Sequence, residues 1–455
     1  MAKEILNNFA IAIGIVIVSI LLSFNDASAV PSFARQSGMD CRACHTVFPE
    51  LTPLGRSFKL GGYLMSANEK PYEFPPPLAG MAQISYTHTD RSQPKGAFED
   101  NWATRVTSRD NNIISIPQQV SVFYGGRIVY NIGAFVQGTY DGNVDQSFLD
   151  NADIRFANNG TMFGRKLIYG ITVNNNPTVQ DVWNSTPAWG FPSATSGIAP
   201  TPTAVAVIDG TLGQQVGGIG LYALWNNLIY AEATLYRTTR NGITRPLGAG
   251  THTDMVVDDV APYWRLVLQQ HWGKKHSLSV GTYGMVANIF PGGNSSGPSD
   301  KFTDIAFDAQ YQYIIKDHIF SAQTTWIHEH QDWDASFALG NAANKSDSLN
   351  TFRINANYYY RSHLGDIGGT VGYFSTTGDK DNLLYAPDPV GGNRTGKPNS
   401  DGFILETDYL PWKAGKISLQ YTIYSKFNGS HSNYDGSGRA ASDNNTLFLI
   451  VWLMF

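Results

Sequence analysis

The stretch KISLQYTI, from Lys416 to Ile423, alternates polar and apolar side chains at every position. Successive side chains of a β-strand point to opposite faces, so this stretch predicts a strand with one polar and one apolar face. Residues 305–313 follow the same alternation, and residues 352–360 largely do. The pattern predicts an all-β chain. Soluble β-sandwiches alternate in the same way, so alternation leaves two architectures open.

The connections between the strands separate these two architectures. Short connections such as Gly125-Gly126, Asn227 and Lys316-Asp317 mostly alternate with long ones such as 90–111, 174–216, 239–261 and 378–399. This alternation and an even number of roughly 16 strands are typical of a transmembrane outer-membrane β-barrel, which at that size encloses an aqueous lumen. The expected strands lie near residues 79–89, 112–124, 127–141, 150–157, 165–174, 217–226, 228–238, 262–273, 275–289, 303–314, 318–330, 349–361, 366–377, 400–411, 415–427 and 443–455.

The composition and the end of the chain agree with a barrel. The last segment, LFLIVWLMF from Leu447 to Phe455, is an apolar strand ending on an aromatic residue, which resembles the C-terminal signature of outer-membrane proteins. Aromatic residues make up 13% of the chain, and Tyr and Trp near strand ends would form girdles at the lipid interfaces. The formal net charge of −5 argues against nucleic acid as a partner. The predicted barrel implies outer-membrane lipid as a partner instead.

The beginning of the chain predicts export. Lys3, an apolar run over 9–22 and the small residues Ala27-Ser-Ala29 form the pattern of a cleaved signal peptide. A transmembrane anchor is the alternative, but a run of about 14 residues is shorter than the roughly 20 that a spanning helix needs. We therefore expect a signal peptide over 1–29, a small haem domain ending in a proline-rich linker over 30–78, and the barrel over 79–455.

Both cysteines of the chain lie in one motif, Cys41-Arg-Ala-Cys44-His45, which is the attachment motif of a c-type haem. Two thiols one helical turn apart can bind the two vinyl groups of one haem, and the adjacent imidazole becomes the proximal iron ligand. A thioredoxin-like site would need a βαβ context, and a zinc site would need four ligands. The motif predicts a single covalent haem c held by Cys41 and Cys44, with His45 on the iron.

The distal iron ligand is open among Met65, Met81 and His88. We place Met65 first because it lies in the same short segment as the motif and because methionine ligation is a usual means of raising the potential. The alternative for Met65 is ordinary packing against the porphyrin.

Two nearby cations, Arg56 and Lys59, either pair with the haem propionates or are solvated surface charges. The segment from residue 30 to about 70 is too short for a core of its own, so a covalent haem would have to stabilise it. Pro71 and the prolines at 75–77 then form a stiff spacer before the first strand.

Two stretches resemble a known family, the fused outer-membrane cytochrome–porins of iron(II)-oxidising bacteria. The first combines PSFARQSG (31–38) with the haem motif, Pro49-x-Leu51 and the pattern GRxFKxxGY (55–63); the second is NNNPTVQDVW (174–183) running into TPAWGFP (186–192). The resemblance covers the whole mature chain. It implies that one haem takes electrons from extracellular Fe(II) and passes them to a periplasmic electron-carrier cytochrome.

That function is outer-sphere electron transfer of an iron(II) oxidase type, with no bond-making catalysis. We expect the haem domain, at the periplasmic side or within the lumen, to fold back as a plug. The rival functions are a porin-type channel that the haem domain plugs or gates, and an electron conduit for a donor other than iron. A soluble cytochrome with a β-rich partner domain is a third alternative.

Two further features bear on the route of the electron. The long connection 174–216 is expected to fold into the lumen, where Trp183 and Trp189 either line the electron path or pack within the loop. His328 and His330 share one face of a strand and are followed by Asp332, which is a candidate iron-docking cluster or a solvated rim. We favour the haem edge itself as the point of electron entry.

Overall fold

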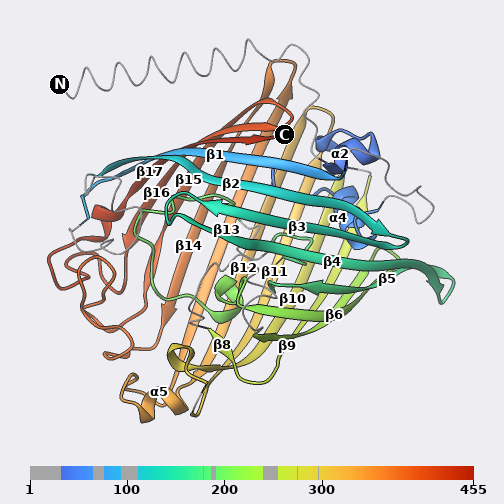
Figure 1. Ribbon diagram of the computed structural model, residues 1–455. Coiled ribbons are helices and arrows are strands. Elements are labelled where there is room, and N and C mark those ends of the chain that lie inside the picture. The colour runs from blue at the N-terminus through green and yellow to red at the C-terminus, as the bar shows by residue number, and fades with distance from the viewer. Residues whose placement is uncertain are drawn as a thin grey trace.

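The computed structural model describes residues 32–64, 76–93, 111–177, 179–185, 191–238, 255–273, 275–295 and 297–455. The predicted signal peptide and Met65 lie outside these ranges. The described chain forms one large antiparallel sheet with short helices (Figure 1). The strands are β1 (Leu78–Thr89), β2 (Asn112–Val129), β3 (Ile132–Asp141), β4 (Gln146–Met162), β5 (Arg165–Asn174), β6 (Val216–Trp225), β7 (Ile229–Thr238), β8 (Val256–Val257), β9 (Ala261–Trp272), β10 (His276–Phe290), β11 (Asp300–Ile314), β12 (His318–Asp332), β13 (Ser346–Ser362), β14 (Gly365–Gly378), β15 (Ser400–Trp412), β16 (Gly415–Lys426) and β17 (Thr446–Met454).

The sheet closes on itself. Each strand pairs with the next along the chain, and the last strand, β17, pairs with β1 so that Met454 lies opposite Met81. β8 is a two-residue piece that pairs with β10 just beyond the end of β9, and β7 pairs with β9. β8 and β9 therefore act as one strand, and the closed barrel has 16 strands, as the sequence predicts.

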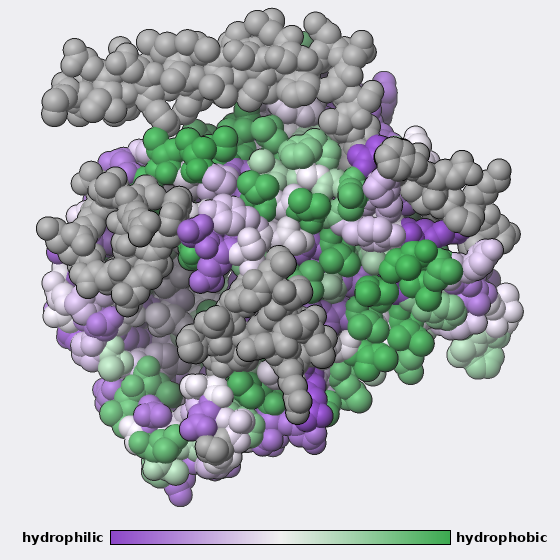
Figure 2. Space-filling model, in the orientation of Figure 1, coloured by the Kyte–Doolittle hydropathy of each residue, from purple (hydrophilic) through white to green (hydrophobic). Residues whose placement is uncertain are grey.

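The barrel has its apolar side chains on the outside. Leu221, Leu268 and Phe307 are more than half exposed, whereas the neighbouring inward residues Arg265 and Asp308 are almost fully buried. The viewed face of the molecule carries hydrophobic patches over the strands (Figure 2). This arrangement is the reverse of a soluble β-sandwich and is the pattern of a barrel whose outer wall faces lipid. Among the described residues, no helix is long and apolar enough to cross a membrane.

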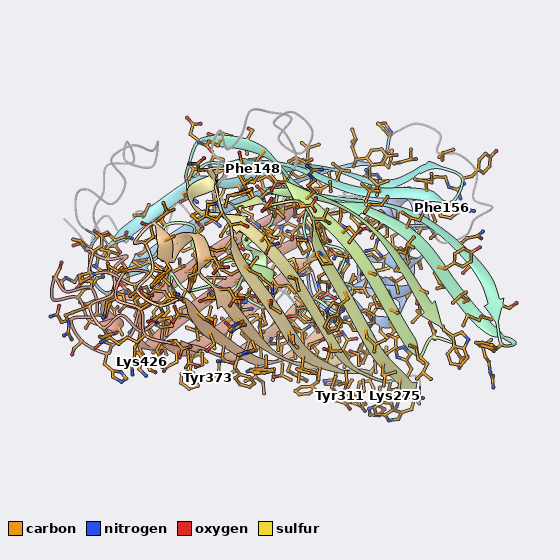
Figure 3. The ribbon with its side chains drawn as sticks, turned by 90° about the horizontal axis from the view of Figure 1, so that it is seen from below. Phe148, Phe156, Lys275, Tyr311, Tyr373 and Lys426 are labelled. Atoms are coloured by element: carbon orange, nitrogen blue, oxygen red, sulfur yellow. The ribbon has the colours of Figure 1, made fainter. Side chains whose placement is uncertain are left out.

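The two ends of the barrel differ. Lys275 and Lys426 mark these ends in Figure 3, and Tyr311 lies on the wall near Lys275. At the Lys275 end the strands are joined by short turns, such as the one at residues 226–228, and at the other end by long connections. Trp272 and His276 stack at 5.2 Å beside Tyr311, which places part of the expected aromatic girdle at the short-turn end.

Among the described residues, two segments lie inside the barrel. The first, called here the N-terminal segment, is residues 32–64 and contains α2 (Ser32–Ser37), α3 (Cys41–Cys44) and α4 (Pro53–Leu60). It bonds to inward side chains of strands on opposite sides of the ring, for example Tyr63 to Asp153 of β4 and Arg42 to Asp366 of β14. α2 and α4 lie at the end of the barrel where β1 begins (Figure 1).

The second segment is the connection between β5 and β6, residues 175–215, called here the inner loop. It includes a short π-helix over Val207–Thr211. The backbone N–H groups of Val207 and Ile208 donate to Glu329 of β12 and Asp304 of β11, and Asp209 pairs with Arg353 of β13. The loop therefore folds into the lumen, as the sequence analysis expects.

The other helices are short and lie among the connections outside the sheet. They are α5 (Asp334–Ala338), a 3₁₀ turn at Pro291–Gly293 and a second at Ala441–Asn444.

Candidate functional site

The two cysteines are presented by the shortest helix of the N-terminal segment. Asp40 caps α3, because its carboxylate accepts a hydrogen bond from the backbone N–H of Arg42 at 3.1 Å. Cys41 and Cys44 lie one turn apart on this helix, are partly buried and form no disulfide. Both line one cavity of about 370 Å³ inside the barrel.

His45 follows directly and lines the same cavity. Its Nδ1 lies 3.3 Å from the carbonyl oxygen of Pro49. A carbonyl oxygen only accepts, so Nδ1 carries the proton in this hydrogen bond and Nε2 keeps a free lone pair. Burial lowers the pKa of His45 to about 4, so the ring is neutral at pH 7. A neutral imidazole held through its other nitrogen by a carbonyl is the usual arrangement of a metal-ligating histidine.

The thiols do not have the surroundings of a redox-active pair. Burial is the largest cause that raises the pKa of both Cys41 and Cys44, and the carboxylate of Asp40 raises that of Cys41 further. Reactive thiols of thioredoxin-like sites instead have lowered pKa values. The surroundings therefore favour attachment over thiol–disulfide exchange.

α3 is tied to the short-turn end of the barrel. Arg42 pairs with Asp366 at 2.8 Å, and Arg361 donates to the carbonyl oxygen of His45 at 3.2 Å. Lys413 pairs with Asp40 at 2.6 Å. These contacts come from β13, β14 and the turn between β15 and β16, so the helix that carries the cysteines is fixed to one side of the wall.

Arg56 on α4 makes the main polar contacts to the neighbouring part of the wall, on β10 and β11. The residue is 2% exposed, and its guanidinium donates to Ser277 at 2.7 Å, to Gln310 at 3.1 Å and to Gln312 at 2.9 Å. It also donates to the carbonyl oxygen of Leu51. Arg56 is therefore not a solvated surface charge. No local pattern indicates this position, because the partners lie more than 200 positions away along the chain.

Lys59 and Leu60 join the N-terminal segment to the inner loop. The ammonium group of Lys59 donates to the carbonyl oxygens of Val179 and Asp181, and its side chain borders the cavity. Leu60 is 1% exposed and packs in one apolar cluster with Trp183. Lys59 is therefore not a solvated charge, and the two inner segments contact each other across the lumen.

Trp183 packs within the inner loop and against the wall, which is the second of the two roles expected for it. It is 1% exposed, lies 5.0 Å from the ring of Tyr230 and has the guanidinium of Arg265 5.1 Å from its ring centre. Arg265 in turn pairs with Asp308 of the wall at 3.0 Å. Trp189 lies outside the described residues.

Part of the cavity wall is built by the barrel itself. Met81 and Met454 line it from β1 and β17, together with Phe123 and Phe135 from β2 and β3. Met454 was not singled out by sequence analysis, although the alternation of β17 places it on the inner face with Trp452. His88 points to the outer face, where its Nδ1 bonds to Asn112 at 3.0 Å, so it does not share the cavity.

The candidate iron-docking cluster near the long loops is divided between the two faces of its strand. His328 and His330 lie on the outer face of β12, whereas Glu329 between them is buried inside the barrel. His330 pairs with the neighbouring Asp332 at 3.3 Å, half exposed. No group of three or more His, Cys, Asp or Glu among the described residues is placed to hold a metal ion. These residues are therefore polar side chains at the rim of the barrel and not a metal site.

The residues of the cavity fit a covalently attached haem. Two thiols one turn apart line a mostly aromatic and aliphatic space, and an imidazole with a free Nε2 lies beside them. Phe33, Phe58 and Tyr63 form a ring cluster on one side, with Phe33 stacked on Tyr63 at 5.5 Å. Such a shell excludes water and holds a flat apolar group.

The comparisons with known proteins agree with the barrel and go no further. No family model and no curated protein matches the sequence. Among solved structures, OmpF of Salmonella typhi in complex with daunomycin is similar over 83% of this chain and 97% of its own, with 10% identity and a TM-score of 0.46. The trimeric form of OmpT from Vibrio cholerae has 10% identity and a TM-score of 0.43, over 83% of this chain and 98% of its own. An anion-selective porin from Comamonas acidovorans has 11% identity and a TM-score of 0.42, over 83% and 98%.

Proposed function

We propose that the protein is an electron conduit of the bacterial outer membrane, in which one c-type haem is held inside the barrel by Cys41 and Cys44, with His45 on the iron. The observation that carries this proposal is the shared cavity: both cysteines and the histidine line one apolar space within a lipid-facing barrel. A bound haem would supply a centre that accepts one electron and releases one electron.

The residues of the chain have separate tasks in this proposal. Cys41 and Cys44 attach the group, and the Pro49 carbonyl orients the His45 ring. Arg56 and Lys59 hold the N-terminal segment against the wall and the inner loop. The two inner segments occupy the lumen from opposite directions, so that solutes are hindered while an electron can cross. No proton donor or nucleophile is required.

We further propose that the donor is extracellular Fe(II) and that the acceptor is a periplasmic electron-carrier cytochrome. The N-terminal segment lies at the short-turn end, and short turns face the periplasm in outer-membrane barrels. The long connections then face outside. Keeping Fe(II) outside also keeps its insoluble ferric product out of the periplasm.

The test is anaerobic stopped-flow mixing of Fe(II) with detergent-purified, haem-loaded ferric protein, followed at the haem α-band. Fast and stoichiometric reduction is expected. If dithionite reduces the haem and Fe(II) does not, the iron donor is wrong. If the purified chain carries no covalent haem after denaturation and acid extraction, the electron-conduit proposal fails as a whole.

A channel gated by the N-terminal segment is the second candidate. The observation that favours it is the nature of the contacts to the wall, which are side-chain hydrogen bonds and ion pairs that can open and close. Planar-bilayer recordings decide between the candidates. A conduit opens equally rarely in both redox states of the haem, whereas a gated channel changes conductance with redox state or with a solute.

A further inference from the structure

We propose that Met81, on the wall of the barrel, supplies the sulfur ligand on the iron face opposite His45. This inference rests on the haem attachment proposed above and names the residue that completes it. The distal ligand would then come from the barrel and not from the N-terminal segment, where sequence analysis places it first.

Met81 is built into the cavity that the haem motif lines. It lies on the inner face of β1, is 3% exposed and borders the same space as Cys41, Cys44 and His45. Gln83, its neighbour on the same face, places Nε2 3.8 Å from the Met81 sulfur. A polar contact of this kind orients the thioether, as the partners of a metal ligand usually do.

The position of Met81 in the sheet is rigid. Its backbone pairs with Met454 of β17 on one side and with Ser121 of β2 on the other. Ligands carried by paired strands are held more precisely than ligands carried by loops. Met454 borders the same cavity, but it is the last residue of its strand and is less buried than Met81. We therefore choose Met81 over Met454.

Met39 and His88 fit less well. Met39 borders the cavity but lies two residues before Cys41, too close for the chain to cross to the other face of the same group. His88 points out of the barrel. Met65 lies outside the described residues, so the experiment must test it directly.

The consequence is that iron coordination depends on docking. Thioether sulfur with histidine is the ligand pair that raises the potential of a c-type haem, which favours uptake of electrons. If the N-terminal segment left the wall, a haem attached to it would lose Met81 as a ligand. Release of the segment would therefore lower the midpoint potential of the haem.

The experiment uses the full-length, haem-loaded protein and three variants: Met81→Leu, with Met454→Leu and Met65→Leu as matched controls. The readouts are the near-infrared sulfur-to-iron charge-transfer band of the ferric protein, the midpoint potential and carbon monoxide binding by the ferrous protein. Met81→Leu should lose the band, lower the potential and bind carbon monoxide rapidly, and both controls should behave like the wild type. Met81→His should restore a six-coordinate spectrum without the band.

Loss of the band in either control, or its retention in Met81→Leu, overturns the assignment. Absence of the band from wild-type protein with covalent haem overturns it as well. Each of these results leaves the proposed conduit intact, because covalent haem and its reduction by Fe(II) are measured separately. A chain without covalent haem refutes the proposed function instead.

Discussion

Replacing Arg56 by methionine should release the N-terminal segment from the wall of the barrel. Methionine keeps an unbranched stem but removes the charge and its donors. Burial lowers the pKa of Arg56 to about 10, so the side chain is still charged at neutral pH. In the variant, Ser277, Gln310 and Gln312 lose their shared donor, and the buried carboxylate of Glu50 loses its nearest positive charge.

The magnitude follows from this environment. Removing one partner of a buried charged network costs about 3–5 kcal/mol, because the remaining groups stay desolvated without partners. This cost applies to docking of the segment, since the donor lies on α4 and three acceptors lie on the wall. The released population should therefore grow by a factor of between about 100 and a few thousand.

Single-channel recording in planar bilayers measures this release, because a barrel of this size is wide enough to conduct and release leaves only the inner loop inside it. Arg56→Met should open far more often than the wild type. The matched control is Lys413→Met, which breaks the half-exposed pair with Asp40, and exposed pairs contribute only about 0–1 kcal/mol. Migration of the unheated protein on a gel shows whether each barrel has formed. If folded Arg56→Met opens as rarely as the wild type, or no more often than the control, the anchoring role is refuted.

Three further predictions use the same preparations. A Cβ added at Gly133 would meet a backbone carbonyl oxygen of the N-terminal segment at 2.1 Å, so Gly133→Ala should increase channel openings, whereas Gly138→Ala on the same strand, which meets nothing within 4 Å, should not. Burial lowers the pKa of Lys59 to about 8 from 10.5, so the released segment binds more protons between these values. Docking of the segment should therefore strengthen, and channel openings become rarer, as pH rises from 8 to 10.5. If a Lys59→Met variant keeps this pH dependence, deprotonation of Lys59 is not its cause. Replacing both His328 and His330 by alanine should leave the rate of haem reduction by Fe(II) nearly unchanged in stopped-flow, because both side chains point outward. A large loss of rate would show that the two histidines take part in docking Fe(II).

The strands could be predicted from the sequence because their signal is local. Lys416 and Gln420 point inward and Leu419 points outward, as the alternation of that stretch requires. The two-residue strand β8 was missed and its residues were assigned to a long connection, because two residues are too few to show a period. The alternation also placed His328 and His330 on one face, and with the strand closed into a barrel that face is the outside.

The candidate site was only half predictable. Cys41, Cys44 and His45 are adjacent in the chain, so their chemistry can be read from spacing without knowing the fold. Arg56 and Lys59 could not be placed in this way, because their partners lie on distant strands and on the inner loop. Both cations are buried and join one inner segment to the wall or to the other segment, so the surface-charge alternative is wrong for each.

The sequence by itself determined the strand pattern, the alternation of short and long connections that indicates a barrel, and the haem-attachment motif, since each depends on residues that lie near one another in the chain. Only the tertiary structure decided where the motif lies. It brought Met81 and Met454, at opposite ends of the barrel sequence, side by side on the wall of the cavity that the cysteines also line. Closure of the sheet pairs the first strand with the last, and no local pattern reports a contact across nearly the whole chain.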